Sequence, residues 1–127
     1  MADTSFSKSS RLLTAAEYKS VFSHTQFKVS CRHFLILAVG NASLKPRLGL
    51  VIAKKNISTA VQRNRIKRQI RESFRHSTEL LNGLDLVVLA RKDADRLDNS
   101  RLRHKIHALL QDLSDKLKHR KKPLAEY

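Results

Sequence analysis

The sequence predicts one α/β domain, an α+β sandwich in which helices pack on a single sheet. Segments with apolar residues at consecutive positions are typical of strands that are covered on both faces. Segments with apolar residues three and four positions apart are typical of amphipathic helices. The chain has 127 residues, of which 41% are hydrophobic, and this is enough for one sizeable core. We therefore expect a single compact domain over residues 1–127, in the order helix–strand–strand–strand–helix–strand–helix.

The first helix is expected after a polar, serine-rich segment, residues 1–11, which we expect to be mobile until it binds a partner. Thr14 and Glu17 have the spacing of a capping box, in which each side chain satisfies a backbone N–H of the other residue. The helix should therefore run from about Ala15 to Ser23.

The next segments are expected to form strands. Phe34–Val39 is apolar throughout, and the Gly40–Ser43 segment that follows it contains turn-forming residues. Leu48–Ala53 is expected to be the returning strand of this hairpin, and Pro46 confines the start of that strand to a sheet edge or a loop. A short strand around Phe27–Val29 is expected to precede both.

The second half of the chain is expected to contain a basic helix, a strand and a last helix. The basic helix should run over about Thr59–Ser77, and the apolar segment Leu84–Ala90 should form a strand. One of the polar residues 98–100 can cap the last helix, which ends before Pro123, and residues 119–127 form a basic tail. Six apolar residues form one seam along the last helix: Leu102, Ile106, Leu109, Leu110, Leu113 and Leu117.

The expected elements leave part of the sheet uncovered. Two amphipathic helices can cover one face, but the short first helix can cover only part of the other. We therefore expect a partly exposed apolar trough lined by Tyr18, Phe22, Leu35 and Leu37. Aromatic residues at such spacing more often belong to a core, but aromatics beside a basic groove are also how proteins hold single-stranded RNA with little sequence preference.

The overall charge restricts the class of partner. The chain has 26 Lys and Arg against 11 Asp and Glu, a formal charge of +15, which for a small folded domain predicts binding to nucleic acid or to an anionic membrane. A membrane is disfavoured, because no apolar run approaches the roughly 20 residues of a spanning helix and the N-terminus does not resemble a signal peptide. The lone Cys31 permits no intramolecular disulfide and fits a cytoplasmic location.

The charge is concentrated on the basic helix and the residues before it. Eight basic residues fall within residues 54–75, where Glu72 is the only acid. Like charges three and four positions apart repel on a helix, so a polyanion is expected to relieve the repulsion. Arg63 lies close to the apolar stripe and Asn64 can bond to local backbone, so each also has a structural interpretation. The stronger candidates for phosphate contacts are Arg65, Lys67, Arg68 and Arg71.

The polypeptide shows no catalytic or metal-binding constellation. The six histidines have no spacing typical of metal ligands, and no cysteine or carboxylate cluster completes a site around His104 and His107. The acids are scattered, without a pair or a cluster suited to two magnesium ions. With three glycines in the chain there is no glycine-rich phosphate loop.

Four motifs resemble, in chain order, those of the bacterial ribonuclease P protein subunit. They are Arg11–Leu12 with Glu17–Phe22, Arg47–Lys55, Arg63–Phe74 with its Arg-Asn-Arg-Ile-Lys-Arg start, and Asp85–Lys92, within a similarity that spans about residues 8–118. The chain has Tyr18 where the family usually has phenylalanine, and Leu37 where some relatives carry an aromatic residue.

The resemblance implies a fold and a role. The fold would contain an unusual left-handed crossover between parallel strands, whereas the general rule predicts a right-handed one. The RNA subunit would be the catalyst and, with magnesium that the RNA mainly binds, would remove the 5′ leader of precursor tRNA. The protein would bind the ribonuclease P RNA and the leader. The residues that would face the catalytic RNA are Arg63, Asn64, Arg65, Lys67, Arg68 and Arg71. Those that would line the leader cleft are Tyr18, Phe22, Leu35, Leu37 and the Lys54–Lys55 end. Arg91 and Lys92 are candidates for a further RNA contact.

Three other classes remain as alternatives from the residues alone. A ribosomal or RNA-chaperone protein would share this composition, and only the trough and the motifs argue against it. A DNA-binding regulator is disfavoured because the basic helix is too uniformly cationic to read bases, so neither DNA nor a membrane is an expected partner. A protein-only nuclease is disfavoured because the acids are scattered.

Overall fold

The computed structural model describes residues 11–12, 14–42 and 45–121. Most of the N-terminal segment that we expected to be mobile, and the end of the basic tail, therefore lie outside the described residues. The helices are α1 (Ala15–Ser23), α2 (Ala60–Arg75) and α3 (Asn99–Lys121), with short 3-10 turns η3 (Thr78–Leu81) and η4 (Ala94–Arg96), and the strands are β1 (Phe27–Ser30), β2 (Phe34–Gly40), β3 (Arg47–Val51) and β4 (Leu84–Ala90). This mixed α+β order confirms the predicted fold class.

The four strands form one sheet in the order β1-β2-β4-β3. Strand β2 pairs antiparallel with both β1 and β4, whereas β3 pairs parallel with β4, placing Leu50 opposite Val88. The prediction that β3 returns from β2 as a hairpin is therefore wrong, because β4 lies between them. The burial explains this order: β4 is almost wholly buried and needs neighbours on both sides, whereas β3 starts directly after Pro46 and lies at an edge.

The connection from β3 through α2 to β4 is the strand–helix–strand crossover that the resemblance implies. Outside β3, the chain adds one further bridge, in which the Leu12 N–H donates to the Leu48 carbonyl at 3.0 Å. The segment before α1 therefore lies along the outer edge of β3. This placement brings Arg11 to the side of the sheet on which α2 lies.

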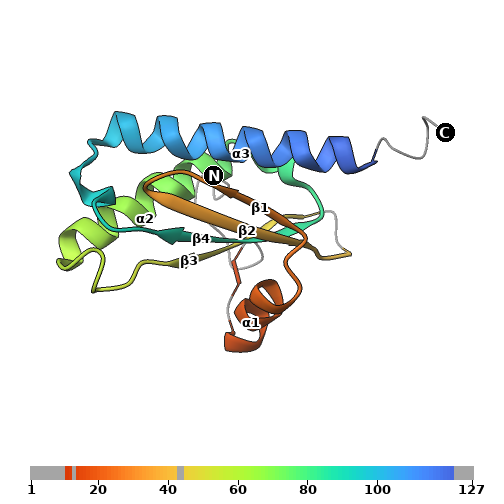
Figure 1. The fold of residues 1–127 in the computed structure, drawn as a ribbon, viewed down its shortest axis with the longest axis horizontal. Helices are drawn as coiled ribbons and strands as arrows, with labels where there is room; N and C mark the ends of the chain where they lie inside the picture. The colour runs from red at the N-terminus through yellow and green to blue at the C-terminus, as the bar shows by residue number, and fades with distance from the viewer. Residues whose placement is uncertain (1–10, 13, 43–44, 122–127) are drawn as a thin grey trace, which may run out of the picture.

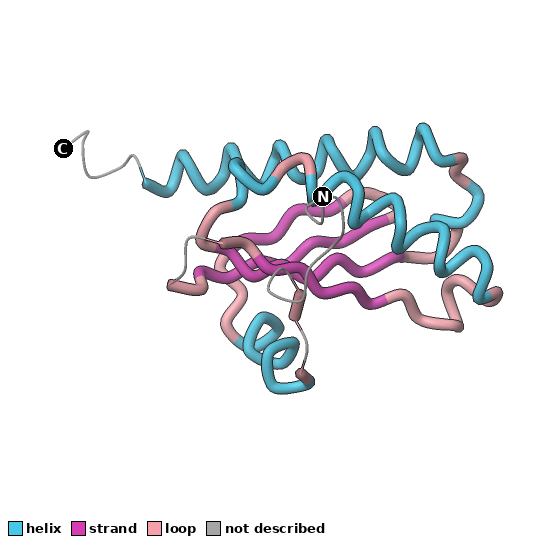
Figure 2. The backbone as a smooth tube through the Cα atoms, turned by 180° about the vertical axis from the view of Figure 1, so that it is seen from behind, coloured by secondary structure: helices cyan, strands magenta, loops and turns pink. Residues whose placement is uncertain are grey.

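Helices α2 and α3 cover one face of the sheet, and α1 lies against the other (Figures 1 and 2). The predicted stripe of α2 is buried at Ile66, Ile70 and Phe74, and the predicted seam of α3 is buried except at its last residue, Leu117, which is partly exposed. The core therefore lies between the sheet and these two helices. The face towards α1 has a smaller cluster, in which Leu12, Val21 and Val87 are buried.

The helix starts agree with the capping signals in the sequence. Thr14 and Glu17 form the predicted capping box of α1, with both hydrogen bonds at 3.1 Å. The Thr59 hydroxyl accepts from Gln62 N at the start of α2, and the Asp98 carboxylate accepts from Arg101 N at 2.8 Å at the start of α3. In the described ranges, no helix combines the length and the apolar character needed to cross a bilayer.

Candidate nucleic-acid interface

Two of the predicted RNA-binding arginines on α2 have partners within the protein. The Arg63 guanidinium donates to the carbonyls of Ile57 and Ser58, at 2.9 and 3.0 Å, and so holds the turn before α2. Arg63 therefore has the structural role that its position near the apolar stripe indicates.

Arg65 is held more extensively than Arg63. Its Nε donates to Gln62 Oε1 at 2.8 Å, its Nη1 to Asn99 Oδ1 at 2.8 Å and its Nη2 to the carbonyl of Asp95 at 2.9 Å. All three guanidinium nitrogens are thus engaged, and they tie α2 to the turn η4 and to the start of α3. Arg65 therefore has a structural role in addition to the phosphate contact that we predict for it.

Three further cations of α2, Lys67, Arg68 and Arg71, have no acidic partner among the described residues, whereas Arg75 pairs with Glu72. Asn64 and Arg68 are exposed. Glu72, the only acid of α2, lies near the end of the helix and pairs there with Arg75 and His76. Hydrogen bonds from Arg75 and then His76 lower the pKa of the Glu72 carboxyl group. The repulsion among these cations is therefore left uncompensated within the described chain.

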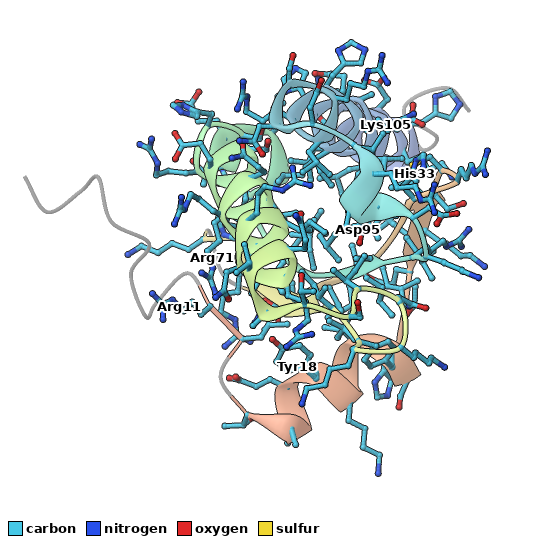
Figure 3. All side chains as sticks on the ribbon, turned by 90° about the vertical axis from the view of Figure 1, so that its left-hand side faces the viewer. Arg11, Tyr18, His33, Arg71, Asp95 and Lys105 are labelled. Carbon is cyan, nitrogen blue, oxygen red and sulfur yellow. The ribbon has the colours of Figure 1, made fainter. Side chains whose placement is uncertain are left out.

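Lys67 and Arg71 line a pocket of about 310 Å³ at the outer edge of β3. Arg11 and Tyr18 also line it, and its apolar floor consists of Leu12, Leu48 and Leu50. Figure 3 shows Arg11 and Arg71 on the same side of the molecule, with Tyr18 of α1 below them. Partial burial, and then the nearby charge of Arg11, lower the pKa of Arg71. A group whose charged form is disfavoured in this way gains from an anion bound beside it.

Tyr18 is fixed at the boundary between this pocket and the sheet. Its hydroxyl accepts from Leu50 N at 3.1 Å, on the open edge of β3. The ring lies on Gly49, where a Cβ atom would be 2.7 Å from Tyr18 Cε2. Glycine is therefore needed at this position for the ring to sit against the strand. The hydroxyl oxygen is used as an acceptor, so its proton can still be donated to a ligand in the pocket.

The four residues predicted to line the trough differ in their exposure. Phe22 is the exposed aromatic of α1, with 44% of its surface accessible. Leu35 and Leu37 alternate on the β2 face that is not packed against α2 and α3, and both are half-buried. Tyr18 joins Leu37 at the small cluster under α1. Of the predicted trough residues, Tyr18 lines the pocket at the edge of β3.

From the sequence alone, Arg11, Leu12, Leu48 and Leu50 were included only as parts of motifs, and none of them was assigned to the site. The bridge between Arg11 and Leu48 that brings these residues together depends on tertiary pairing. Leu48 and Leu50 lie two positions apart in the predicted strand, but the expected hairpin with β2 gave no indication that the other edge of β3 lies beside Arg11 and Leu12.

Two further basic segments lie near the carboxyl end of β4. Lys54 and Lys55 are exposed on the turn after β3, which Asn56 ties to the sheet by donating from Nδ2 to the Ala90 carbonyl at 3.1 Å. Arg91 and Lys92, which follow β4, are also exposed. Lys54–Lys55 and Arg91–Lys92 therefore lie near each other, because both pairs follow the carboxyl ends of the adjacent strands β3 and β4.

The described residues contain no group of three or more histidine, cysteine, aspartate or glutamate side chains that could hold a metal ion. The pocket is instead lined by basic side chains, one tyrosine and apolar surface. The fold and this surface define a small basic α/β protein of the nucleic-acid-binding class.

Comparisons with known proteins assign the family. The Ribonuclease P family model matches residues 6–114. The ribonuclease P protein component of Chromohalobacter salexigens is 46% identical over 113 residues, which cover 89% of this chain and 88% of that one. The protein component of Pseudomonas aeruginosa is 49% identical over 113 residues, covering 89% and 84%. The chain belongs to the ribonuclease P protein family.

Solved structures agree with this assignment. The RNase P protein of Staphylococcus aureus has a TM-score of 0.75 at 28% sequence identity, covering 82% of this chain and 94% of that one. The RNase P protein of Thermotoga maritima has a TM-score of 0.71 at 30% identity, covering 80% and 96%. Such a protein is a component of a tRNA-processing endoribonuclease and has the ribonuclease P RNA as its partner.

Proposed function

We propose that this chain binds the ribonuclease P RNA through α2 and holds the 5′ leader of precursor tRNA beside α1, in the cytoplasm. The observation that carries the proposal is the pocket at the edge of β3. Cations from α2 and the tyrosine of α1 meet there, so the surface for the catalytic RNA and the surface for the leader are continuous.

The cations of α2 support the first half of the proposal. Lys67, Arg68 and Arg71 have no acidic partner among the described residues, so phosphates can pair with them without breaking an ion pair of the protein. Contacts of this kind position an RNA backbone without reading its sequence. Asn64, exposed on the same helix, can add a neutral hydrogen bond.

The α1 side supports the second half. Phe22 offers an exposed ring on which a base of a single-stranded leader can stack, a contact that tolerates any base. Leu35 and Leu37 provide half-buried apolar surface on β2. Lys54 and Lys55 lie at the carboxyl end of β3, where they can meet leader phosphates. A leader is variable in sequence, and a surface of this composition suits such a ligand.

Catalysis is assigned to the RNA in this proposal, and the polypeptide contributes binding and charge. Two polyanions, the catalytic RNA and the precursor tRNA, repel each other when they associate. A protein with a formal charge of +15 placed between them lowers that cost. Magnesium would be held mainly by RNA phosphates that the protein orders.

The test is reconstitution from separate components. RNA-free protein should leave precursor tRNA intact, whereas protein with the ribonuclease P RNA should remove the leader at modest magnesium concentration. A double Lys67→Ala, Arg71→Ala variant should need more protein for the same rate. Lys118→Ala, which removes an exposed charge from α3, is the matched control. Magnesium-dependent cleavage by the protein alone, or recovery of ribosomal RNA only from cell extracts, would contradict the proposal.

A further inference from the structure

Arg47 links α1 to the centre of the sheet through two carboxylates. Arg47 and Asp85 are register partners on β3 and β4, and the guanidinium donates to both oxygens of Asp85, at 2.9 and 2.7 Å. Its Nη1 also donates to Glu17 Oε2 on α1 at 2.8 Å. Asn41 Nδ2 donates to Asp85 Oδ1 at 2.8 Å. These bonds, first of all those with Asp85, raise the pKa of Arg47.

Glu17 uses its two oxygens for different purposes. Oε1 accepts from Thr14 N and completes the capping box, while Oε2 accepts from Arg47. The same carboxylate therefore caps the start of α1 and connects α1 to β3. Asp85 is buried, so its end of the network is fixed in the sheet.

Helix α1 has few other anchors. Val21 is the one fully buried residue among its nine, all of which are described. The Tyr18 hydroxyl also accepts one hydrogen bond from Leu50 N. Because α1 buries little apolar surface, polar contacts decide how it lies on the sheet, and Figure 1 shows it apart from the layer of α2 and α3.

The network also reduces the negative charge near the proposed leader surface. Glu17 and Asp85 are the only acids of α1 and the four strands, whose residues are all described. Both are paired with Arg47. Without Arg47, the two carboxylates would carry two negative charges, instead of a net charge of one for the network, beside the surface proposed for the leader phosphates.

We infer that Arg47 is a positioning residue for the 5′ leader: through Glu17 it fixes α1, and with it Phe22, at the orientation that the leader requires. The inference rests on the proposed function, since it assigns a role within the leader site. Arg47 itself is engaged by the two carboxylates and acts through α1.

The experiment varies Glu17 and leaves the buried end of the network intact. Holoenzyme is assembled from the ribonuclease P RNA and each protein variant, and its affinities for precursor tRNA and mature tRNA are measured. Glu17→Ala should reduce the preference for precursor tRNA by about two- to fivefold, the range expected for a partly exposed ion pair. The preference of Glu17→Gln should fall between those of the wild type and Glu17→Ala. The glutamine side chain has one amide oxygen, which can accept from Thr14 N or from Arg47 but not from both.

Thr14→Ala is the matched control, because it weakens the cap of α1 and keeps the Glu17–Arg47 pair. It should retain the preference, with affinities measured at a temperature where thermal denaturation shows every variant folded. Equal losses in Thr14→Ala and Glu17→Ala would reduce Glu17 to a helix cap and overturn the inference, as would a full preference in Glu17→Ala. A wild-type holoenzyme without any preference would contradict the proposed function instead.

Discussion

At the scale of single residues, basic side chains that look equivalent in the sequence differ in what they can do. Arg65 and Arg68 are both α2 arginines and both predicted phosphate contacts. The first has three partners in the protein, and the second is exposed without an acidic neighbour in the described chain. A guanidinium that already ties three segments together has to be judged by stability as well as by RNA binding.

We predict that Arg68→Ala and Arg65→Ala separate these two roles. Arg68→Ala should flatten the dependence of log affinity on log salt by roughly 0.7–0.9 for each phosphate that the variant no longer neutralises. It should change the free energy of unfolding by less than about 0.5 kcal/mol. Arg65→Ala should instead cost about 1–3 kcal/mol of stability, because a charged donor with three acceptors is removed. Salt titrations and urea denaturation measure both quantities, and an unchanged stability in Arg65→Ala would show that its contacts are not structural.

Phe22 gives the second prediction at this scale. If it stacks on a leader base, Phe22→Ala should weaken precursor tRNA binding by about 1–3 kcal/mol and leave mature tRNA binding nearly unchanged. Its 44% exposure argues against the roughly 3–5 kcal/mol stability loss that a core phenylalanine would show. Equal losses for both RNAs, together with a large fall in the denaturation midpoint, would remove Phe22 from the leader site.

At the scale of elements, the fit between α1 and β3 depends on one glycine. We predict that Gly49→Ala displaces the Tyr18 ring, because the added Cβ would lie 2.7 and 2.8 Å from two ring carbons. The hydrogen bond from Leu50 N to the tyrosine hydroxyl should break with it. Near-ultraviolet circular dichroism and precursor tRNA affinity should both change. Gly49→Ala in a Tyr18→Ala background should have a much smaller effect, and equal effects in the two backgrounds would contradict the proposed clash.

The sequence predicted the elements well and their pairing less well. Local signals suffice for the helix starts, because Thr14, Thr59 and Asp98 each accept from the backbone N–H three positions further on. The stripe of α2 and the seam of α3 follow from periodicity. The position of β3 in the sheet does not follow from local signals. Turn residues after β2 look the same whether β3 pairs with β2 or β4 lies between them.

The candidate site shows the same division. The cationic face of α2 is a property of one helix and can be read from spacing. The network of Arg47 joins residues 17, 47 and 85, and only the parallel register of β3 with β4 makes them neighbours. Asp85 stands out in the sequence as the one charge in an apolar strand, but its partner cannot be inferred without that register.

At the scale of the whole molecule, topology and charge are the two global properties. The parallel β3–β4 pair joined through α2 is present, and its left-handed sense remains a prediction from the resemblance, since strand patterns carry no information on handedness and the general rule gives the opposite hand. Charge can be read from composition directly. A formal charge of +15 implies self-repulsion in the folded state, which bound anions relieve.

This repulsion leads to the last prediction, that millimolar sulfate stabilises the free protein at constant ionic strength. Lys67, Arg71 and Arg11 line one pocket, and partial burial, followed by the nearby charge of Arg11, lowers the pKa of Arg71. An anion bound there only in the folded state adds about 1.4 kcal/mol at ten times its Kd, enough to raise Tm by a few degrees.

The matched comparison removes the general effect of sulfate on apolar burial, which does not depend on a site. Lys67→Ala and Arg71→Ala should each reduce the rise in Tm on replacing chloride with sulfate, and the double variant should nearly abolish it. Lys118→Ala, which removes a charge far along α3, should keep the full rise. The same rise in Tm in all variants would show that sulfate acts through the solvent and would contradict a phosphate site in the pocket.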